Sequence, residues 1–166
     1  MIPSIDLSLQ DGVSIDETAF LARAVNILSE AVEIADLKFP EGAELSLVLA
    51  GDKTLKALNN QWRQKDKPTN VLSFPGDDIA VGEAAGMMLG DIVISLETTA
   101  HEASLENKTF EDHLSHLVVH GFLHLFGYDH DTDEEATQME SLETRILNEL
   151  GIEDPYDANP YENETL

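Results

Sequence analysis

Three histidines near the end of the chain have the spacing of a metal site. His120 and His124 are four residues apart, so on a helix both imidazoles lie on one face. Gly127 follows, and a glycine there predicts a sharp exit from the helix that brings His130 back to the same point. Such a pattern is rare by chance in a chain with six histidines and ten glycines. Three imidazoles with an open fourth position are typical of a catalytic zinc site, so we predict one zinc ion per chain.

The residue after the first histidine separates this motif from that of the metzincin proteases. Those enzymes share the spacing H-x-x-x-H-x-x-G-x-x-H, and their general base is a glutamate directly after the first histidine. Here that position is Gly121, which has no side chain to accept a proton from zinc-bound water. The metal geometry can therefore be shared while peptide hydrolysis by that mechanism is unsupported. Two alternatives remain: three unconnected histidines on a helix and a loop, and a purely structural metal, for which no residue obviously supplies the fourth ligand.

Further polar residues surround the motif. His116 lies one turn before His120 and either lines the cleft, where it could orient a substrate, or sits at the solvated edge of the helix. His113, almost one turn earlier, is expected to be solvated. Asp129 stands next to His130 and either accepts a hydrogen bond from a metal-binding imidazole or caps the exit of the helix.

Composition and charge limit the classes of function. A chain of 166 residues that is 42% hydrophobic fits one globular domain with its own core. The absence of cysteine excludes disulfides and thiolate metal sites, so a metal must be held by His, Asp or Glu. The net charge of −24 opposes adsorption to nucleic acid or to anionic lipid. The sequence shows no signal peptide and no apolar run near ~18 residues, so we expect a cytoplasmic protein without a membrane partner.

Most of the few basic residues lie together. Five of the nine fall in a short window that forms either a solvated helix face or a local anion site: Lys53, Lys56, Arg63, Lys65 and Lys67. Trp62 lies in the same window and could stack on a nucleobase. Because Leu55 and Leu58 precede it on the same expected helix, the sequence favours a core position for this indole.

Periodicity and turn residues predict interleaved strands and helices. We expect strands over residues 4–10, 45–50, 71–74 and 88–96, and helices over 17–35, 52–63, 97–106, from 107 or 109 to 126, and 133–150. This order indicates one layered α/β or α+β domain on a four-stranded sheet, over residues 1–152. Residues 153–166 are acidic and poor in apolar side chains, which indicates a loosely attached C-terminal tail.

Four blocks of sequence resemble the YbeY family of bacterial, zinc-dependent, single-strand-specific endoribonucleases. They are NNQWRQKDKPTNVLSFP, GDIVIS, HLVVHGFLHLFGYDH and MESLETRILNELG, in that order, and the resemblance runs from about residue 45 to 156. It implies a zincin-like α+β fold in which the metal helix packs on a mixed sheet. It also implies action on single-stranded ribosomal RNA, including maturation of the 3′ end of the small-subunit RNA, a role in ribosome quality control, and the ribosome or its proteins as partners.

The resemblance also implies roles for particular residues. His120, His124 and His130 would be the zinc ligands, and Arg63 would be the arginine that faces the metal cleft. The family's usual PTDVLSFP is PTNVLSFP here, with Asn70 where aspartate is commoner. Because both residues cap turns, we expect no loss of fold, but a role that needs a carboxylate at this position would be lost.

These residues suggest a chemistry and leave part of it open. Arg63 can give phosphate two parallel hydrogen bonds, with Lys65 and Lys67 as weaker positive support. The general base could be His116 or a second metal-bound water, and the nucleophile could be water or the RNA 2′-hydroxyl. The rival functions are a zinc metallopeptidase and a metal-stabilised ribosome-assembly factor without catalysis. The acidic charge predicts weak intrinsic RNA affinity, with partner proteins or the ribosome supplying localisation.

Overall fold

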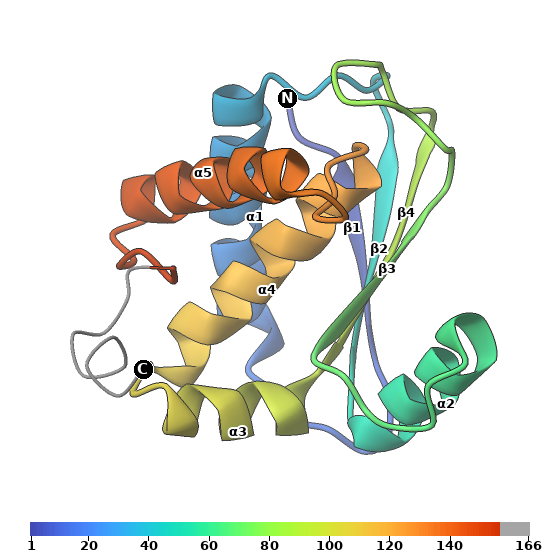
Figure 1. Cartoon of the computed structure of the whole chain (residues 1–166), viewed down its shortest axis with the longest axis vertical. Helices are drawn as coiled ribbons and strands as arrows, with labels where there is room; N and C mark the ends of the chain where they lie inside the picture. The colour runs from blue at the N-terminus through green and yellow to red at the C-terminus, as the bar shows by residue number, and fades with distance from the viewer. Residues whose placement is uncertain (157–166) are drawn as a thin grey trace.

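A computed structural model describes residues 1–156 of the chain. Strands and helices are interleaved in the first part of the chain, and three helices follow the last strand, in the order that the sequence predicts (Figure 1). The elements are β1 (Ser4–Leu9), α1 (Glu17–Ala35), β2 (Glu44–Ala50), α2 (Asp52–Arg63), β3 (Val71–Pro75), β4 (Met88–Ser95), α3 (Leu96–Leu105), α4 (Phe110–Leu125) and α5 (Asp133–Glu149).

The strands form one mixed sheet in the order β1-β2-β4-β3. β1, β2 and β4 run parallel, and β3 pairs antiparallel with β4 at the edge. Pro75 ends β3, which fits an edge strand because proline cannot donate to a neighbouring strand. The predicted α+β domain with a four-stranded mixed sheet is therefore confirmed.

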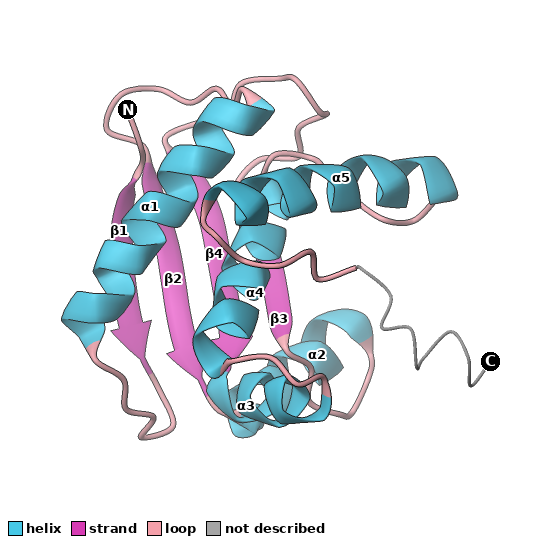
Figure 2. Ribbon diagram, turned by 90° about the vertical axis from the view of Figure 1, so that its left-hand side faces the viewer, coloured by secondary structure: helices cyan, strands magenta, loops and turns pink. Residues whose placement is uncertain are grey.

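Helices cover the two faces of the sheet unequally. α1, α4 and α5 lie over one face, as Figure 2 shows from the side of α1, and the main core lies between them and the sheet. α2 covers the other face near β3 and β4, above a small cluster made of Ala50, Leu55, Leu72 and Val93. α2 and α4 therefore flank the edge strand β3 from opposite faces of the sheet.

The helix that carries the histidines is held closely against the sheet. Thr109, one of the two predicted start residues, caps α4 by accepting a hydrogen bond from the backbone N–H of Asp112 at 3.1 Å. A Cβ atom at Gly121 would lie 2.8 Å from Cγ2 of Ile92 and 3.1 Å from Oγ of Ser73. Gly121 therefore allows α4 to approach β3 and β4 more closely than any larger residue would.

The described start of the predicted tail packs against α5. The carboxylate of Asp154 accepts hydrogen bonds from the Thr144 hydroxyl at 3.1 Å and from the backbone N–H of Tyr156 at 2.8 Å. The remainder of the tail, 157–166, lies outside the described residues, so the predicted boundary at residue 152 stays a prediction. Within residues 1–156, no helix combines the length and the apolar character needed to cross a bilayer.

Candidate metal centre

The last two turns of α4 and the loop after it bring three imidazoles together. His120 and His124 belong to α4, and His130 lies in the loop before α5. Their ring centroids are 4.6 Å apart for His120 and His124, 5.6 Å for His120 and His130, and 5.1 Å for His124 and His130. One ring nitrogen from each of the three lies within 4.8 Å of the other two, which is close enough for a shared metal ion.

A glycine-based helix end returns the chain toward the site. Gly127 has a φ of +94°, its N–H bonds to the carbonyl of His124 at 3.2 Å, and the N–H of Tyr128 bonds to the carbonyl of Leu123 at 3.3 Å. These two bonds define a Schellman motif, which satisfies the last carbonyls of α4. Tyr128 then enters the main core, so the following residues, including His130, are directed back toward the helix.

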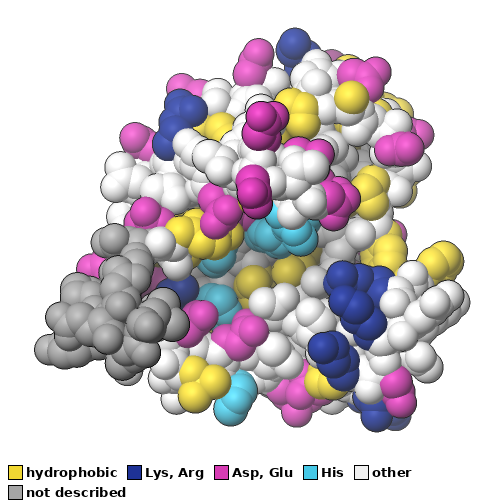
Figure 3. Space-filling view, in the orientation of Figure 1, with side chains coloured by type: hydrophobic (Ala, Val, Ile, Leu, Met, Phe, Trp, Pro, Cys, Tyr) yellow, Lys and Arg dark blue, Asp and Glu magenta, His cyan; other side chains and the backbone are white. Residues whose placement is uncertain are grey.

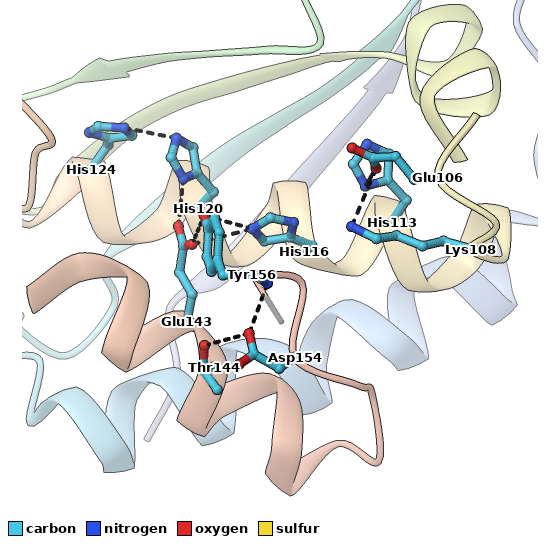
Figure 4. Close-up of polar contacts among 10 residues, drawn as sticks. All are labelled: Glu106, Lys108, His113, His116, His120, His124, Glu143, Thr144, Asp154 and Tyr156. Atoms are coloured by element: carbon cyan, nitrogen blue, oxygen red, sulfur yellow. Dashed lines mark hydrogen bonds and ion pairs between the residues drawn. The ribbon is translucent and has the colours of Figure 1, made fainter. Parts of the chain in front are cut away.

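Hydrogen bonds fix which nitrogen of each α4 ring is free. Nδ1 of His124 lies 2.8 Å from the carbonyl oxygen of Tyr128, and Nδ1 of His120 lies 2.5 Å from Oε1 of Glu143 (Figure 4). A carbonyl and an ionised carboxylate can only accept, so both Nδ1 atoms carry the proton. The two Nε2 atoms therefore present lone pairs to each other at 3.1 Å.

Two facing lone pairs repel unless a cation lies between them. In a tetrahedral zinc site with Zn–N distances of about 2.0–2.1 Å, two ligand nitrogens are about 3.3 Å apart. The 3.1 Å separation of Nε2 in His120 and His124 is close to that value. The donor set and its hydrogen bonds therefore fit a divalent metal with imidazole ligands.

His124 is suited to bind a cation rather than a proton. Burial, together with the nearby imidazoles of His120 and His130, lowers the pKa of His124 to about 4. The ring is therefore neutral at physiological pH, which is the form that ligates metals.

A buried carboxylate, that of Glu143, holds the ring of His120 in place. Glu143 of α5 is fully buried and contacts three donors: His120, the Nε2 atom of His116 at 3.2 Å, and the Tyr156 hydroxyl. Burial raises the pKa of Glu143, but the hydrogen bonds from His116 and His120 outweigh it and lower this pKa to about 2. Burial and the Glu143 charge raise the pKa of Tyr156, so its hydroxyl remains a donor.

Sequence reasoning missed Glu143, although a signal was present. Met139, Glu143 and Ile146 follow one another at helical spacing on α5, and all three are buried. A carboxylate on an otherwise apolar helical stripe indicates a buried partner, because an unpaired charge there would be very costly.

One cavity connects the three histidines with Arg63. It has a volume of about 490 Å³, and its lining includes Arg63 at the C-terminal end of α2, every residue of β3 except Phe74, and four carboxylates: Asp77, Asp78, Asp129 and Asp131. In Figure 3 the histidines lie in a hollow, and Lys and Arg side chains gather on the side where Figure 1 places α2. Lys65 and Lys67 are exposed and do not line this cavity.

Two other histidines differ from the sequence-based expectation. His116 does not line the cavity of about 490 Å³, and it does not lie at a solvated edge either, because only 12% of its side chain is exposed. Its Nε2 atom faces Glu143 and the Tyr156 hydroxyl, both at 3.2 Å. The expectation that His113 is solvated is wrong: it is buried, and its Nε2 atom lies 2.9 Å from Glu102 of α3.

Trp62 and Asp129 also gain definite positions. Trp62 was expected in the core, but this residue is 63% exposed, because it lies at the C-terminal end of α2 next to β3, the edge strand of the sheet. The Asp129 carboxylate accepts a hydrogen bond from the backbone N–H of His130 at 2.8 Å. Of the two alternatives for Asp129, the structure shows the contact of a turn at the helix exit.

Asn70 has a side chain suited to its neighbours. Its Nδ2 atom donates to Oε1 of Glu102 at 3.0 Å, and its Oδ1 atom accepts from the backbone N–H of Val71 at 2.7 Å. The same carboxylate oxygen of Glu102 lies 2.9 Å from His113. An aspartate at position 70 would face Glu102 with like charge, so the amide is the better partner for this carboxylate.

Comparison with known proteins assigns the chain to a family. A family model described as Endoribonuclease YbeY matches residues 7–151. The chain belongs to the YbeY family. The resemblance of the four sequence blocks is thereby confirmed, and the family match begins well before residue 45, at residue 7.

Individual YbeY relatives and a solved structure agree with this assignment. Endoribonuclease YbeY of Sinorhizobium fredii is 48% identical over 161 residues, covering 94% of this chain and 93% of the relative. Endoribonuclease YbeY of Allorhizobium ampelinum is 52% identical over 145 residues, covering 85% and 87%. A solution structure of a Thermotoga maritima protein matches with a TM-score of 0.55 and 25% identity, covering 95% of this chain and all of that one.

Proposed function

We propose that this chain is a zinc-dependent endoribonuclease that cuts single-stranded RNA and acts in ribosomal RNA processing. One observation carries the proposal: the free Nε2 lone pairs of His120 and His124 meet beside His130, in the same cavity as Arg63. The relatives bear the name endoribonuclease, which points to the phosphodiester as the bond that is cut.

The histidines would hold the metal, and the surrounding residues would hold the histidines. His120, His124 and His130 offer three nitrogen ligands and leave a fourth position open toward the cavity. Bound there, zinc would supply a Lewis acid for a phosphate oxygen and a water of lowered pKa. Glu143 and the Tyr128 carbonyl keep both α4 rings in the tautomer that ligates through Nε2.

Arg63 would bind the scissile phosphate. Its guanidinium can donate two parallel hydrogen bonds to the nonbridging oxygens, where negative charge increases during attack at phosphorus. The four aspartates of the cavity repel phosphate elsewhere on its wall, so we infer that RNA approaches from the side of α2. Lys65 and Lys67 follow Arg63 and would raise the positive potential along this approach.

His116 has a geometry that favours a positioning role over proton transfer. Its Nε2 atom is directed at Glu143 and not into the cavity. Together with Tyr156 it gives the buried carboxylate its second and third hydrogen bonds. We therefore assign His116 to the support of His120 through Glu143, and a catalytic role for His116 has no support from its surroundings.

The two rival functions have less support. A metzincin-like base at position 121 would have to enter the space that Ile92 and Ser73 fill, so it could not stand beside the metal. A non-catalytic assembly factor would need the metal but not an arginine in the same cavity.

With a net charge of −24, the chain would rely on the ribosome or its proteins to bring it to ribosomal RNA, such as the small-subunit 3′ end.

Cleavage of one structured RNA with and without a chelator tests the proposal. The RNA carries a duplex stem and unpaired loops, and casein is incubated in parallel as a peptidase substrate. We expect cuts within the loops only, abolished by the chelator and restored by zinc. Cuts in casein alone would assign the site to a peptidase, and no cuts in either substrate would favour the assembly factor.

A further inference from the structure

We propose that Trp62 is a stacking platform for an unpaired nucleobase of the bound RNA. This inference rests on the proposed nuclease function and adds to it a basis for single-strand specificity. It assigns a ligand contact to a residue that lies outside the cavity of the metal site.

The indole is both exposed and held in place. Trp62 is 63% exposed, although tryptophan is a residue that folding normally covers. It contacts Phe74 of β3 in a T-shaped arrangement, with ring centroids 6.1 Å apart and an interplanar angle of 60°. Phe74 itself packs against the small cluster under α2. The T-shaped contact orients the indole and covers only part of it, so little rotational freedom would be lost when a base stacks on the rest.

The position of Trp62 relative to Arg63 fits one strand of RNA. The two are consecutive at the C-terminal end of α2, with Cα atoms about 3.8 Å apart, and on a helix their side chains diverge by about 100°. Arg63 lines the cavity of the metal site, whereas Trp62 contacts Phe74, whose neighbours Ser73 and Pro75 on β3 line that cavity. A strand whose phosphate is held by Arg63 can therefore place a neighbouring base on the indole.

Because the protein is acidic, a contact that does not depend on charge is important for its affinity for RNA. If phosphate contacts alone held the RNA, its affinity would be low, because the protein has a net charge of −24 and four aspartates line the cavity. Stacking on an aromatic ring needs no counterion and tolerates any base. In a duplex both faces of each base are already covered by neighbours, so only an unpaired base can use Trp62. Stacking therefore supplies affinity and selects single strands at the same time.

Tryptophan fluorescence reports directly on this contact, because Trp62 is the only tryptophan in the chain. The zinc-loaded protein is mixed in a stopped-flow instrument with a single-stranded RNA octamer, and emission is followed before cleavage. The same octamer with abasic positions keeps its phosphates, and a third sample is annealed to its complement. We expect quenching by the unpaired octamer and little by the other two. Equal quenching by the abasic strand, or no quenching of a protein that cuts the octamer, would overturn the proposal.

Variants separate stacking from other roles of the indole. We expect Trp62→Ala to raise KM for single-stranded RNA about tenfold with kcat and thermal stability nearly unchanged, and Trp62→Phe to retain most of the affinity. Leu105→Ala is the matched control, since Leu105 is 70% exposed and does not line the cavity. An unchanged KM in Trp62→Ala together with weaker ribosome binding would make the indole a protein contact and contradict the proposal. Failure of the wild-type protein to cut RNA would instead contradict the nuclease function.

Discussion

At the scale of single residues, the metal site depends on the hydrogen bonds that the Nδ1 atoms of His120 and His124 donate. His120 and His124 would be ordinary helix histidines if their Nδ1 atoms were free. Because Glu143 and the Tyr128 carbonyl accept from those atoms, the Nε2 lone pairs are fixed toward one point. Glu143 is in turn held by His116 and Tyr156, so His120 and His124 belong to a larger polar network (Figure 4).

Glu143→Gln tests this support. The amide keeps the size of the side chain but replaces one accepting oxygen by an N–H₂ donor, which cannot satisfy both His120 and His116. We expect zinc affinity to fall about 10- to 100-fold, as for other residues that orient metal ligands. Competition with a fluorescent chelator measures this affinity, with the exposed Glu149→Gln on the same helix as control. Equal affinity in Glu143→Gln and wild type would show that the carboxylate is not needed to orient His120.

Arg63→Lys tests the phosphate contact. Lysine keeps the charge but loses the planar fork that binds two oxygens at once. We expect kcat/KM for RNA to fall about 100-fold, while zinc content and thermal stability stay unchanged, because Arg63 is exposed and lines the cavity. Arg145→Lys, an exposed arginine on α5, is the control. Wild-type cleavage by Arg63→Lys would exclude a bidentate role.

At the scale of elements, the site is made by α4, by the turn that ends it and by the edge of the sheet. The bounds of these elements follow from the sequence because local signals set them: Thr109 caps the start of α4, and Gly127 allows its exit. Contacts between elements carry no comparable local signal. Glu143 reaches His120 from another helix, and the buried His113 has its carboxylate partner, Glu102, on α3. Trp62 has the helical spacing of a core residue, but the sheet ends at β3 and leaves it uncovered.

Gly121→Ala tests the close packing of α4 on the sheet. The added Cβ would lie 2.8 Å from Ile92, and such overpacking costs about 1–3 kcal/mol. The better helix propensity of alanine returns up to about 1 kcal/mol, so we expect a net loss of about 1 kcal/mol and a Tm lower by about 3 °C. Ser29→Ala at an exposed position of α1 makes a similar propensity change without a clash. A Tm at or above that of wild type would show that the helix and sheet can separate without cost.

At the scale of the whole molecule, the acidic charge and the basic end of α2 act against each other. The net charge of −24 repels RNA at long range, whereas Arg63, Lys65 and Lys67 attract it locally. Salt screens the long-range term first, because the Debye length falls from about 30 Å at 0.01 M to about 10 Å at 0.1 M. Stacking on Trp62 is not screened. The molecule thus relies on short-range contacts to bind a substrate that its overall field repels.

The salt dependence of cleavage follows from this balance. We expect kcat/KM for a short single-stranded RNA to rise between about 0.01 and 0.1 M KCl, as long-range repulsion is screened. At higher salt it should fall slowly, because only about three phosphate contacts release counterions. Initial rates measured at a fixed zinc concentration give this profile. A steep and continuous fall in kcat/KM from the lowest salt concentration upward would indicate that the RNA contacts a larger basic surface than the structure provides.

The measurement that tests the central claim most directly is a zinc titration of RNA cleavage. Metal-free protein at a known concentration receives increasing zinc, and the initial rate of loop cleavage is recorded at each step. With three imidazoles and one open position, we expect no activity without metal, a linear rise, and a plateau at one zinc per chain. His124→Ala should show no plateau at one zinc per chain, whereas the variant of an exposed histidine, His101→Ala, should match wild type. Full activity of the metal-free protein, or an unchanged titration in His124→Ala, would contradict a metal nuclease centred on His120, His124 and His130.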